Sequence, residues 1–264
     1  MGSRNTRPPR SLVSKTLDVL DAFSPEHPAL TLSDISSRSG LPLTTTHRIV
    51  KDLTAWGALE RNDDGRYHIG LHLWEVAALA PRGLGLREVA LPYMEDLYGV
   101  TQENVQLAVR ENVELVFVER LTGRHAVPVR TRVGGRFALH ATGVGLVLLA
   151  FAPHDVQEQI LASPLESWTE KTIADPEMLR RVLADVRRTG IAVSDRQVTM
   201  DAVSVAAPIL GADDGVVAAL SVVVHADDAD PVALAPAVRT AARGISRALG
   251  SPSARRRPDS PIPR

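Results

Sequence analysis

The sequence predicts two domains: an N-terminal winged helix-turn-helix, mostly α with a β-hairpin wing, joined by a linker helix to an α+β domain with an antiparallel sheet. Two short helical patterns meet at a tight turn around Gly40 and Pro42, as in a helix-turn-helix. Two short apolar runs then flank a polar turn at residues 62–65, which indicates a hairpin. Beyond residue 85, helical and strand patterns are mixed, and this mixture favours an α+β domain.

Three helices are expected in the first domain. The first begins at Ser11, and its apolar face is expected to contain Val13, Leu17, Leu20 and Phe23. Thr31 or Ser33 can cap the second, because a hydroxyl accepts the free N–H groups of the first turn. Gly40 suits the left-handed residue that ends this helix. The third starts near Thr44, and its apolar stripe consists of Ile49, Val50, Leu53 and Trp56.

Polar side chains gather at the start of the third helix, where a recognition helix places residues against base edges and phosphates. These side chains are Thr44, Thr45, Thr46, His47, Arg48 and Lys51. The alternative is that they only solvate a helix start. Three consecutive threonines favour DNA contact, because threonine is a mediocre helix former. Arg61 and Arg66 lie near the expected wing, and Arg10 ends a basic arm that either touches the DNA or is a solvated tail.

Composition bounds the function further. A chain of 264 residues has room for about two domains, and it contains no cysteine, which excludes disulfides and cysteine nucleophiles. We see no signal peptide and no apolar run near the roughly 20 residues that span a bilayer, so we expect a cytoplasmic protein without membrane contact. No cofactor or metal is expected, since Gly70 separates His68 and His72 at a strand end.

The net charge of the chain does not by itself indicate a nucleic-acid-binding protein. The net charge is −1, and residues 1–80 hold as many acidic as basic residues. The charges are segregated, however, because basic residues occupy the leading tail and the third helix while acids occupy the preceding elements. Local placement matters more than the total for phosphate contact. Affinity for DNA is expected to rely on pairing two such heads.

The expected boundaries are a disordered basic arm at residues 1–10, the winged helix at 11–70, a linker helix at 71–85, a second domain at 86–250 and a disordered tail at 251–264. In the second domain, helices are expected at residues 87–98, 143–152, 155–161, 176–189 and 231–249. Strands or β-rich segments are expected at residues 104–110, 114–120, 127–133, 191–193, 203–210 and 216–224.

A glycine-containing turn at Thr142 and Gly143 leads into an apolar helix. Thr142 can cap this helix, and Gly143 lets a ligand approach the free N–H groups closely. A helix N-terminus favours an anion, so a carboxylate ligand is a physical expectation here. The alternative is a glycine-rich helix start without a ligand. The glycines do not match a dinucleotide-binding fingerprint.

Three stretches resemble the IclR family of transcriptional regulators. LTLSDISSRSGLPLTTTHRIVKDLTAWGALERNDDGRYHIG resembles the winged helix of that family. RFALHATGVGLVLLAFAP and VSVAAPILGADDGVVAALSVVV are similar to two signature stretches of its effector-binding domain. The order and spacing of the three are specific, and the resemblance covers nearly the whole chain except its tails. It implies a GAF-like sheet with a ligand pocket and a linker helix that helps to pair two subunits.

The resemblance also implies where an effector would bind. The residues that match the family's contacts are Gly143, Val144, Ser194, Ser204 and Ser221. Several positions depart from the family pattern: Ser194 replaces an acid, Leu146 a lysine, Asp201 a glycine and Val223 a polar residue. These departures imply a more apolar or differently shaped pocket, and a larger, aromatic acid in place of the family's small keto acids.

Three functions compete. The first is a regulator in which a homodimer reads an inverted repeat in promoter DNA and an organic acid shifts its arrangement. The second is a DNA-binding regulator whose second domain only oligomerises, without an effector. The third, an enzyme, is disfavoured, since the sequence holds no G-x-S-x-G motif and no paired-carboxylate or metal spacing. A tetramer follows from the resemblance alone. The effector, the operator and the direction of regulation are not determined by the sequence.

Overall fold

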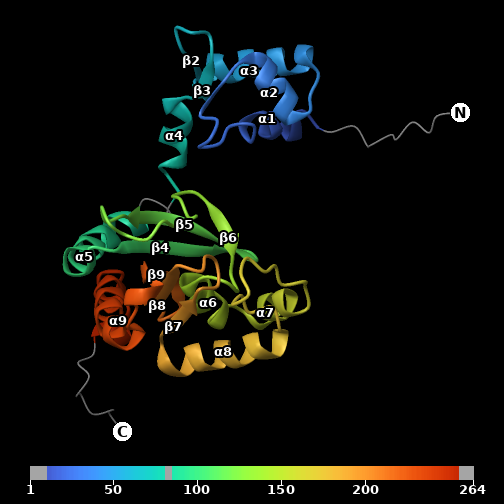
Figure 1. Ribbon diagram of the computed structural model, residues 1–264. Coiled ribbons are helices and arrows are strands. Elements are labelled where there is room, and N and C mark those ends of the chain that lie inside the picture. Colours follow the sequence, from blue (N-terminus) through green and yellow to red (C-terminus); the bar gives the residue numbers. More distant parts are fainter. Residues whose placement is uncertain (1–10, 81–84, 256–264) are drawn as a thin grey trace, which may run out of the picture. The chain divides into compact units, whose positions relative to one another are not determined.

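The computed structural model describes residues 11–80 and 85–255, and Arg10 and most of the expected C-terminal tail lie outside them. The chain divides into two compact units, residues 1–80 and 81–264. Figure 1 shows a helical unit with a small hairpin and a mixed unit built on a larger sheet. The predicted fold class, a winged helix-turn-helix followed by an α+β domain with an antiparallel sheet, is confirmed.

The first unit is a helical head with a three-stranded antiparallel sheet in the order β1-β3-β2. Its elements are α1 Leu12–Leu20, β1 Ala29–Leu30, α2 Leu32–Ser39, α3 Leu43–Trp56, β2 Leu59–Arg61, β3 Tyr67–Ile69 and α4 Leu71–Ala77. The strand β1, which pairs with β3, was not expected from the sequence. One core joins the three helices to the sheet, and it contains Val19, Leu30, Ile35, Ile49 and Leu59.

The turn between α2 and α3 is set by local chemistry. Thr31, and not Ser33, caps α2: its hydroxyl accepts the N–H of Asp34, and the Asp34 carboxylate accepts the N–H of Thr31. The hydroxyl of Thr31 also donates to this carboxylate, and these bonds lower the pKa of Asp34. Gly40 ends α2 with φ 66°, a left-handed conformation that glycine adopts without steric cost.

The expected apolar face of α1 was half right, since Leu20 and Phe23 do pack against the core of the head. Val13 and Leu17 are more than half exposed, whereas Val19 is fully buried. Trp56, expected in the stripe of α3, is half exposed and stacks against His72 with ring centroids 4.3 Å apart. An apolar pattern indicates a helix, but the direction from which neighbouring helices pack decides which of its residues are buried.

The second unit is built on a six-stranded sheet in the order β6-β5-β4-β9-β8-β7, in which all neighbours are antiparallel. Its strands are β4 Asn104–Glu111, β5 Glu114–Leu121, β6 Arg136–Ala138, β7 Ala192–Asp195, β8 Ala202–Leu210 and β9 Val216–His225. Its helices are α5 Leu86–Thr101, α6 Gly143–Ala150, α7 His154–Leu161, α8 Pro176–Thr189, the short 3-10 helix η2 Ala226–Asp228, α9 Pro231–Ala248 and α10 Pro252–Arg255.

Helices cover both faces of this sheet. On one face, α5 and α9 pack against alternate strand residues such as Leu107, Val205 and Leu220. On the other face, the residues between them in sequence, such as Ala206 and Ala219, pack against α6. Because side chains of a strand alternate between faces, long apolar runs are required in β8 and β9.

Two expectations in the second unit were wrong. Residues 127–133, expected as β-rich, lie in an irregular stretch between β5 and β6. Carbonyl groups of this stretch accept hydrogen bonds from side chains: the Val127 carbonyl from Asn104 and the Thr131 carbonyl from Arg120. These carbonyl groups therefore need no hydrogen-bond partner in a neighbouring strand. The start of the expected C-terminal tail forms α10, because the buried Ser251 caps it by accepting the N–H of Ala254.

A buried histidine packs just before α6. His140 is 4% exposed, its Nε2 lies 2.9 Å from the Glu166 carbonyl oxygen, and its ring lies 5.5 Å from that of Trp168. Since the partner is a carbonyl oxygen, Nε2 carries the proton and donates. Burial lowers the pKa of His140, although the bond to Glu166 opposes this effect. The neutral ring thus holds residues 163–175 against the segment that leads into α6.

We predict that this packing makes the fold sensitive to acid. Because the pKa of His140 is lowered on folding, the unfolded chain binds more protons below the ordinary value of 6.5, and stability is lost as pH falls through that region. The variant His140→Gln keeps a donor but does not titrate. Its melting temperature should fall less than that of the parent between about pH 7.5 and about pH 5.5. His125→Gln, at an exposed position, is the control, and an equal fall in all three proteins would contradict the prediction.

Candidate nucleic-acid interface and ligand cavity

One side of α3 is exposed and polar. Thr44, His47, Arg48 and Lys51 are all exposed. They recur at spacings of three and four residues, so they share one side of the helix. The turn that holds α3 places the Pro42 carbonyl against the N–H groups of Thr45 and Thr46. Hydroxyl, imidazole, guanidinium and ammonium groups on this side can donate hydrogen bonds to base edges and phosphates.

Thr46 does not belong to this surface. It is fully buried, and its hydroxyl donates to the Pro42 carbonyl at 3.2 Å. It lies on the same side of α3 as Ile49 and Val50, which face the core of the head. Thr45 is half-buried, at the border of the exposed side. The run of threonines therefore serves two purposes, and only its first member is fully available to a ligand.

The arginines of the wing are held by neighbouring groups. Arg61 donates from Nε to the Gly65 carbonyl at 3.1 Å, and its guanidinium lies 5.5 Å from the centre of the Tyr67 ring. Arg66 pairs with Asp64 at 3.7 Å. Both arginines lie at the turn between β2 and β3, as expected for the tip of a wing. Arg10 lies outside the described residues.

A small cavity of about 50 Å³ lies on the α6 face of the sheet in the second unit. Its walls come from β4, β7, β8 and β9, from the residue that caps α6, and from the irregular stretch after β5. The polar residues that line it are Gln106, Arg130, Thr131, Thr142, Ser194, Thr199 and Ser204. Of the lining residues, only Arg130 carries a charge, and it is exposed on the outer side.

The start of α6 lies close against β8. The Thr142 hydroxyl accepts the N–H of Gly145 at 3.0 Å, whereas the N–H groups of Gly143 and Val144 have no acceptor within the helix. A Cβ on Gly143 would lie 2.6 Å from the Ser204 hydroxyl oxygen, so glycine is required for this approach. A helix end with free N–H groups beside hydroxyls is suited to a carboxylate.

The five effector positions inferred from the resemblance separate into distinct groups. Ser194 and Ser204 line the cavity, and Ser194 donates to the Ala141 carbonyl at 2.7 Å. Gly143 adjoins Ser204 without lining the cavity. The Val144 side chain is buried in the core around α6, so this residue can offer a ligand only its backbone.

Ser221 is fully buried and pairs with Gln106 across β4 and β9, on the face that carries the cavity. Within the described part of the chain, its hydroxyl has no hydrogen-bond partner, and neither has the side-chain oxygen of the buried Asn104. An unpaired buried polar group is costly. Neither Ser221 nor Asn104 lines the cavity, although both lie on the face of the sheet that carries it.

Sequence reasoning missed Gln106, Arg130 and Thr131 as cavity residues. Gln106 stands as a buried polar residue within an apolar strand, and this pattern was a usable signal. Arg130 and Thr131 carried no such signal, because their segment was assigned to a strand and its neighbours in space come from distant parts of the chain.

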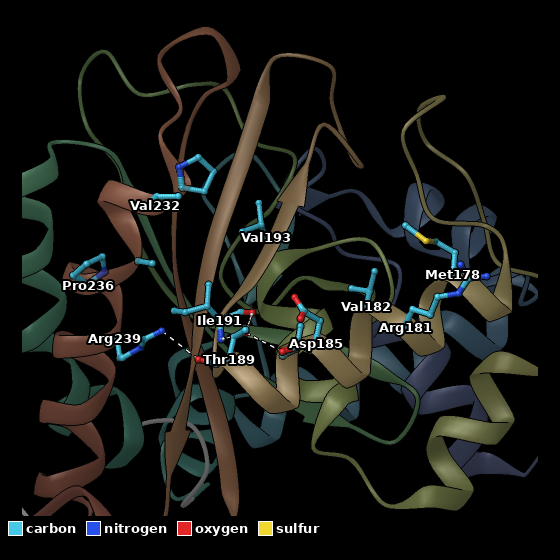
Figure 2. A pocket seen from close by; sticks show the side chains of 13 residues that line it. Met178, Arg181, Val182, Asp185, Thr189, Ile191, Val193, Val232, Pro236 and Arg239 are labelled. Carbon is cyan, nitrogen blue, oxygen red and sulfur yellow. Dashed lines mark hydrogen bonds between the residues drawn. The ribbon is translucent and has the colours of Figure 1, made fainter. Parts of the chain in front are cut away.

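A larger hollow of about 840 Å³ lies between α8, β7 and α9 (Figure 2). Figure 2 shows apolar side chains such as Val182, Ile191 and Val193 along it, and the Arg239 guanidinium donates to the Thr189 carbonyl at 3.2 Å. The residues that line this hollow include no buried polar side chain that could orient a small ligand. We therefore assign no ligand to it.

The described residues lack two kinds of feature, a cluster of metal ligands and a membrane-spanning helix. No group of three or more His, Asp or Glu side chains in residues 11–80 and 85–255 could hold a metal ion. Within the same residues, no helix is long and apolar enough to cross a membrane.

Two family models match the chain. The IclR helix-turn-helix domain matches residues 12–63, and the C-terminal domain of the bacterial transcriptional regulator IclR matches residues 79–247. The HTH-type transcriptional regulator KipR of Bacillus subtilis is 32% identical, over 90% of this chain and 96% of its own length. The HTH-type transcriptional repressor AllR of Escherichia coli is 32% identical, over 83% of each chain.

Solved structures agree. An IclR homologue from Microbacterium hydrocarbonoxydans, complexed with 4-hydroxybenzoate, is 39% identical with a TM-score of 0.87, over 90% of this chain and 99% of its own. The IclR of Thermotoga maritima is 25% identical with a TM-score of 0.75, over 90% of this chain and 98% of its own. The relatives are named as transcriptional regulators and repressors, not as enzymes. The chain therefore belongs to the IclR family of transcriptional regulators.

Proposed function

We propose that this regulator reads double-stranded promoter DNA with the exposed side of α3. The observation that carries the proposal is the clustering of Thr44, His47, Arg48 and Lys51 on one side of a helix whose other side is anchored in the core. In a helix-turn-helix protein this is the geometry that enters the major groove. The wing arginines Arg61 and Arg66 would then contact the adjacent backbone. Because the target is promoter DNA, we expect the protein to act in the cytoplasm.

A second copy of the same chain is the expected partner. Helices α1 and α4 expose large apolar side chains that find no cover within the described part of the head: Leu12, Val13, Leu17, Leu71 and Trp74. Exposed apolar clusters on a soluble protein mark interaction surfaces. Two-fold pairing of heads through these helices would match an inverted repeat and would offset the low net charge of a single head. The proposed assembly is a homodimer, and a tetramer would be two such dimers.

We further propose that the second unit senses an aromatic carboxylic acid, and 4-hydroxybenzoate is the probe we would use. Three observations support this choice. The related Microbacterium protein was solved with 4-hydroxybenzoate. The cavity is lined by Thr142, which caps α6, and by one charged residue, Arg130, whose guanidinium is suited to pair with a carboxylate. The hydroxyls of Thr142, Ser194 and Ser204 line the same cavity and are suited to hydrogen bonds with a phenolic hydroxyl.

The alternative, a second unit that only oligomerises, is favoured by one observation. The cavity of about 50 Å³ is far below the roughly 300–1,000 Å³ typical of ligand pockets. On the sensing proposal, the irregular stretch that carries Arg130 must therefore move when a ligand enters. Ligand binding by the full chain separates the two functions.

For DNA binding, we expect Arg48→Ala and Lys51→Ala to weaken binding to a duplex that the full chain selects from a random library. Loss of a base contact at Arg48 should cost about 1–3 kcal/mol and relax sequence preference. Loss of a phosphate contact at Lys51 should lower the salt dependence by about 0.9 per contact. Lys15→Ala, on α1, removes the same charge elsewhere in the head. If Lys15→Ala has the same effect as the two α3 variants, the proposed interface is wrong.

For ligand binding, we expect 4-hydroxybenzoate at about 100 times its dissociation constant to stabilise the full chain by about 2.7 kcal/mol, seen as a raised melting temperature. Arg130→Gln should weaken binding about tenfold or more, as loss of a charge-assisted hydrogen bond does. Arg132→Gln, on the same stretch but outside the cavity lining, is the matched control. 4-Hydroxybenzamide, which lacks the charge, should bind weakly. Absence of any shift with the acid would support the oligomerisation-only alternative.

A further inference from the structure

The irregular stretch between β5 and β6 is fastened at Val127, whose carbonyl accepts from Asn104, and next to the cavity at Thr131. The Gln106 amide donates to the Thr131 hydroxyl at 2.7 Å, and the Arg120 guanidinium donates to the Thr131 carbonyl. Gln106 and Thr131 both line the cavity, but Arg120 does not. Any ligand that displaces this stretch must therefore disturb the contact that holds Arg120 in place.

Arg120 is joined in turn to a buried carboxylate. Glu119 is 7% exposed, and its Oε1 accepts the backbone N–H of Arg120 at 2.7 Å. Its other oxygen, Oε2, pairs with the Nε of Arg87. A carboxylate buried to this degree depends on both partners, since a buried charge that loses its partner is strongly destabilising. A shift that reaches the Arg120 backbone would thus disturb the pair that Glu119 forms with Arg87.

Arg87 lies in the first turn of α5. The residue before that helix, Gly85, provides no side-chain cap, and a cation near a helix N-terminus is unfavourable because of the helix dipole. The pair with Glu119 offsets this disadvantage and fastens the beginning of α5 to β5. Residues 81–84 connect this beginning, along the chain, to α4 of the head.

We propose that Thr131, Arg120, Glu119 and Arg87 form a relay that couples filling of the cavity to the first turn of α5. The proposal rests on the sensing function proposed above and specifies how that site would be regulated. Since the cavity has room for only a few waters, an aromatic acid must displace the stretch that contains Thr131. The displaced stretch releases Arg120, and the Glu119–Arg87 pair rearranges. The first turn of α5, which follows the segment from the head along the chain, then changes its arrangement.

The test uses two arginines that each pair with a glutamate of β5. Arg87→Met removes the pair with Glu119, and Arg136→Met removes the exposed pair between Arg136 and Glu114, 3.3 Å apart, on the same strand. In the full chain, 4-hydroxybenzoate should stabilise Arg136→Met as it does the parent, and Arg87→Met at least as much, because the stretch that the acid displaces is already loosened there. The change in operator affinity that the acid causes should fall to within about twofold of none in Arg87→Met and should persist in Arg136→Met. Persistence of the full change in Arg87→Met would overturn the relay.

A second measurement needs no ligand. Because coupling between sites is reciprocal, Arg87→Met should raise hydrogen exchange in residues 127–133 by about fivefold or more, and Arg136→Met should not. Faster exchange confined to the start of α5 would overturn the relay. If 4-hydroxybenzoate fails to bind the parent, the aromatic-acid proposal fails while the exchange result still decides the relay. If Arg87→Met does not fold, the same measurements use Glu119→Gln, which keeps the acceptor oxygen but loses the charge. Its control is then Glu114→Gln.

Discussion

The close contact between α6 and the sheet is the constraint on which the second unit depends. Every residue of α6 is buried, and the helix reaches the sheet only because Gly143 meets Ser204 without a Cβ. Gly145 is constrained in the same way, since a Cβ there would lie 2.4 Å from the Leu139 carbonyl oxygen. This approach buries apolar area on one face of the sheet and leaves a helix end with free N–H groups facing hydroxyls. The small cavity beside this helix end is thus a by-product of how the core is packed.

The head carries few positive charges for a unit of a DNA-binding regulator. The exposed side of α3 carries two permanent cations, Arg48 and Lys51, and the wing arginines already interact with Asp64, Gly65 and Tyr67. Phosphate contacts supply much of the affinity of DNA-binding proteins, so a single head of this kind would bind weakly. Pairing of two heads through exposed apolar helices would supply the missing affinity. The regulation of spacing between heads then becomes an effective control of binding.

The second unit places its polar groups where such control could begin. A small cavity adjoins a stretch of chain fastened by side chains and not by a strand ladder. Side-chain hydrogen bonds of this kind break and re-form at lower cost than a ladder, so the stretch can take up more than one position. The buried carboxylate of Glu119 adds the opposite property, because it tolerates few arrangements. A two-state response requires a segment that can move, here the irregular stretch after β5, beside a group that tolerates few arrangements, here the Glu119 carboxylate.

The sequence by itself determined the features that depend on local chemistry. A cap at Thr31 or Ser33, the Gly40 turn and the bounds of α8 follow from short-range hydrogen bonds and dihedral preferences, which neighbouring residues encode. The family resemblance likewise placed Ser194 and Ser204, which do line the cavity. Only the tertiary structure decided that Thr46 is buried, that residues 127–133 form no strand, and that Arg130 and Gln106 meet at one cavity. These outcomes depend on contacts between segments far apart in the chain, and local patterns carry no record of which segments will meet.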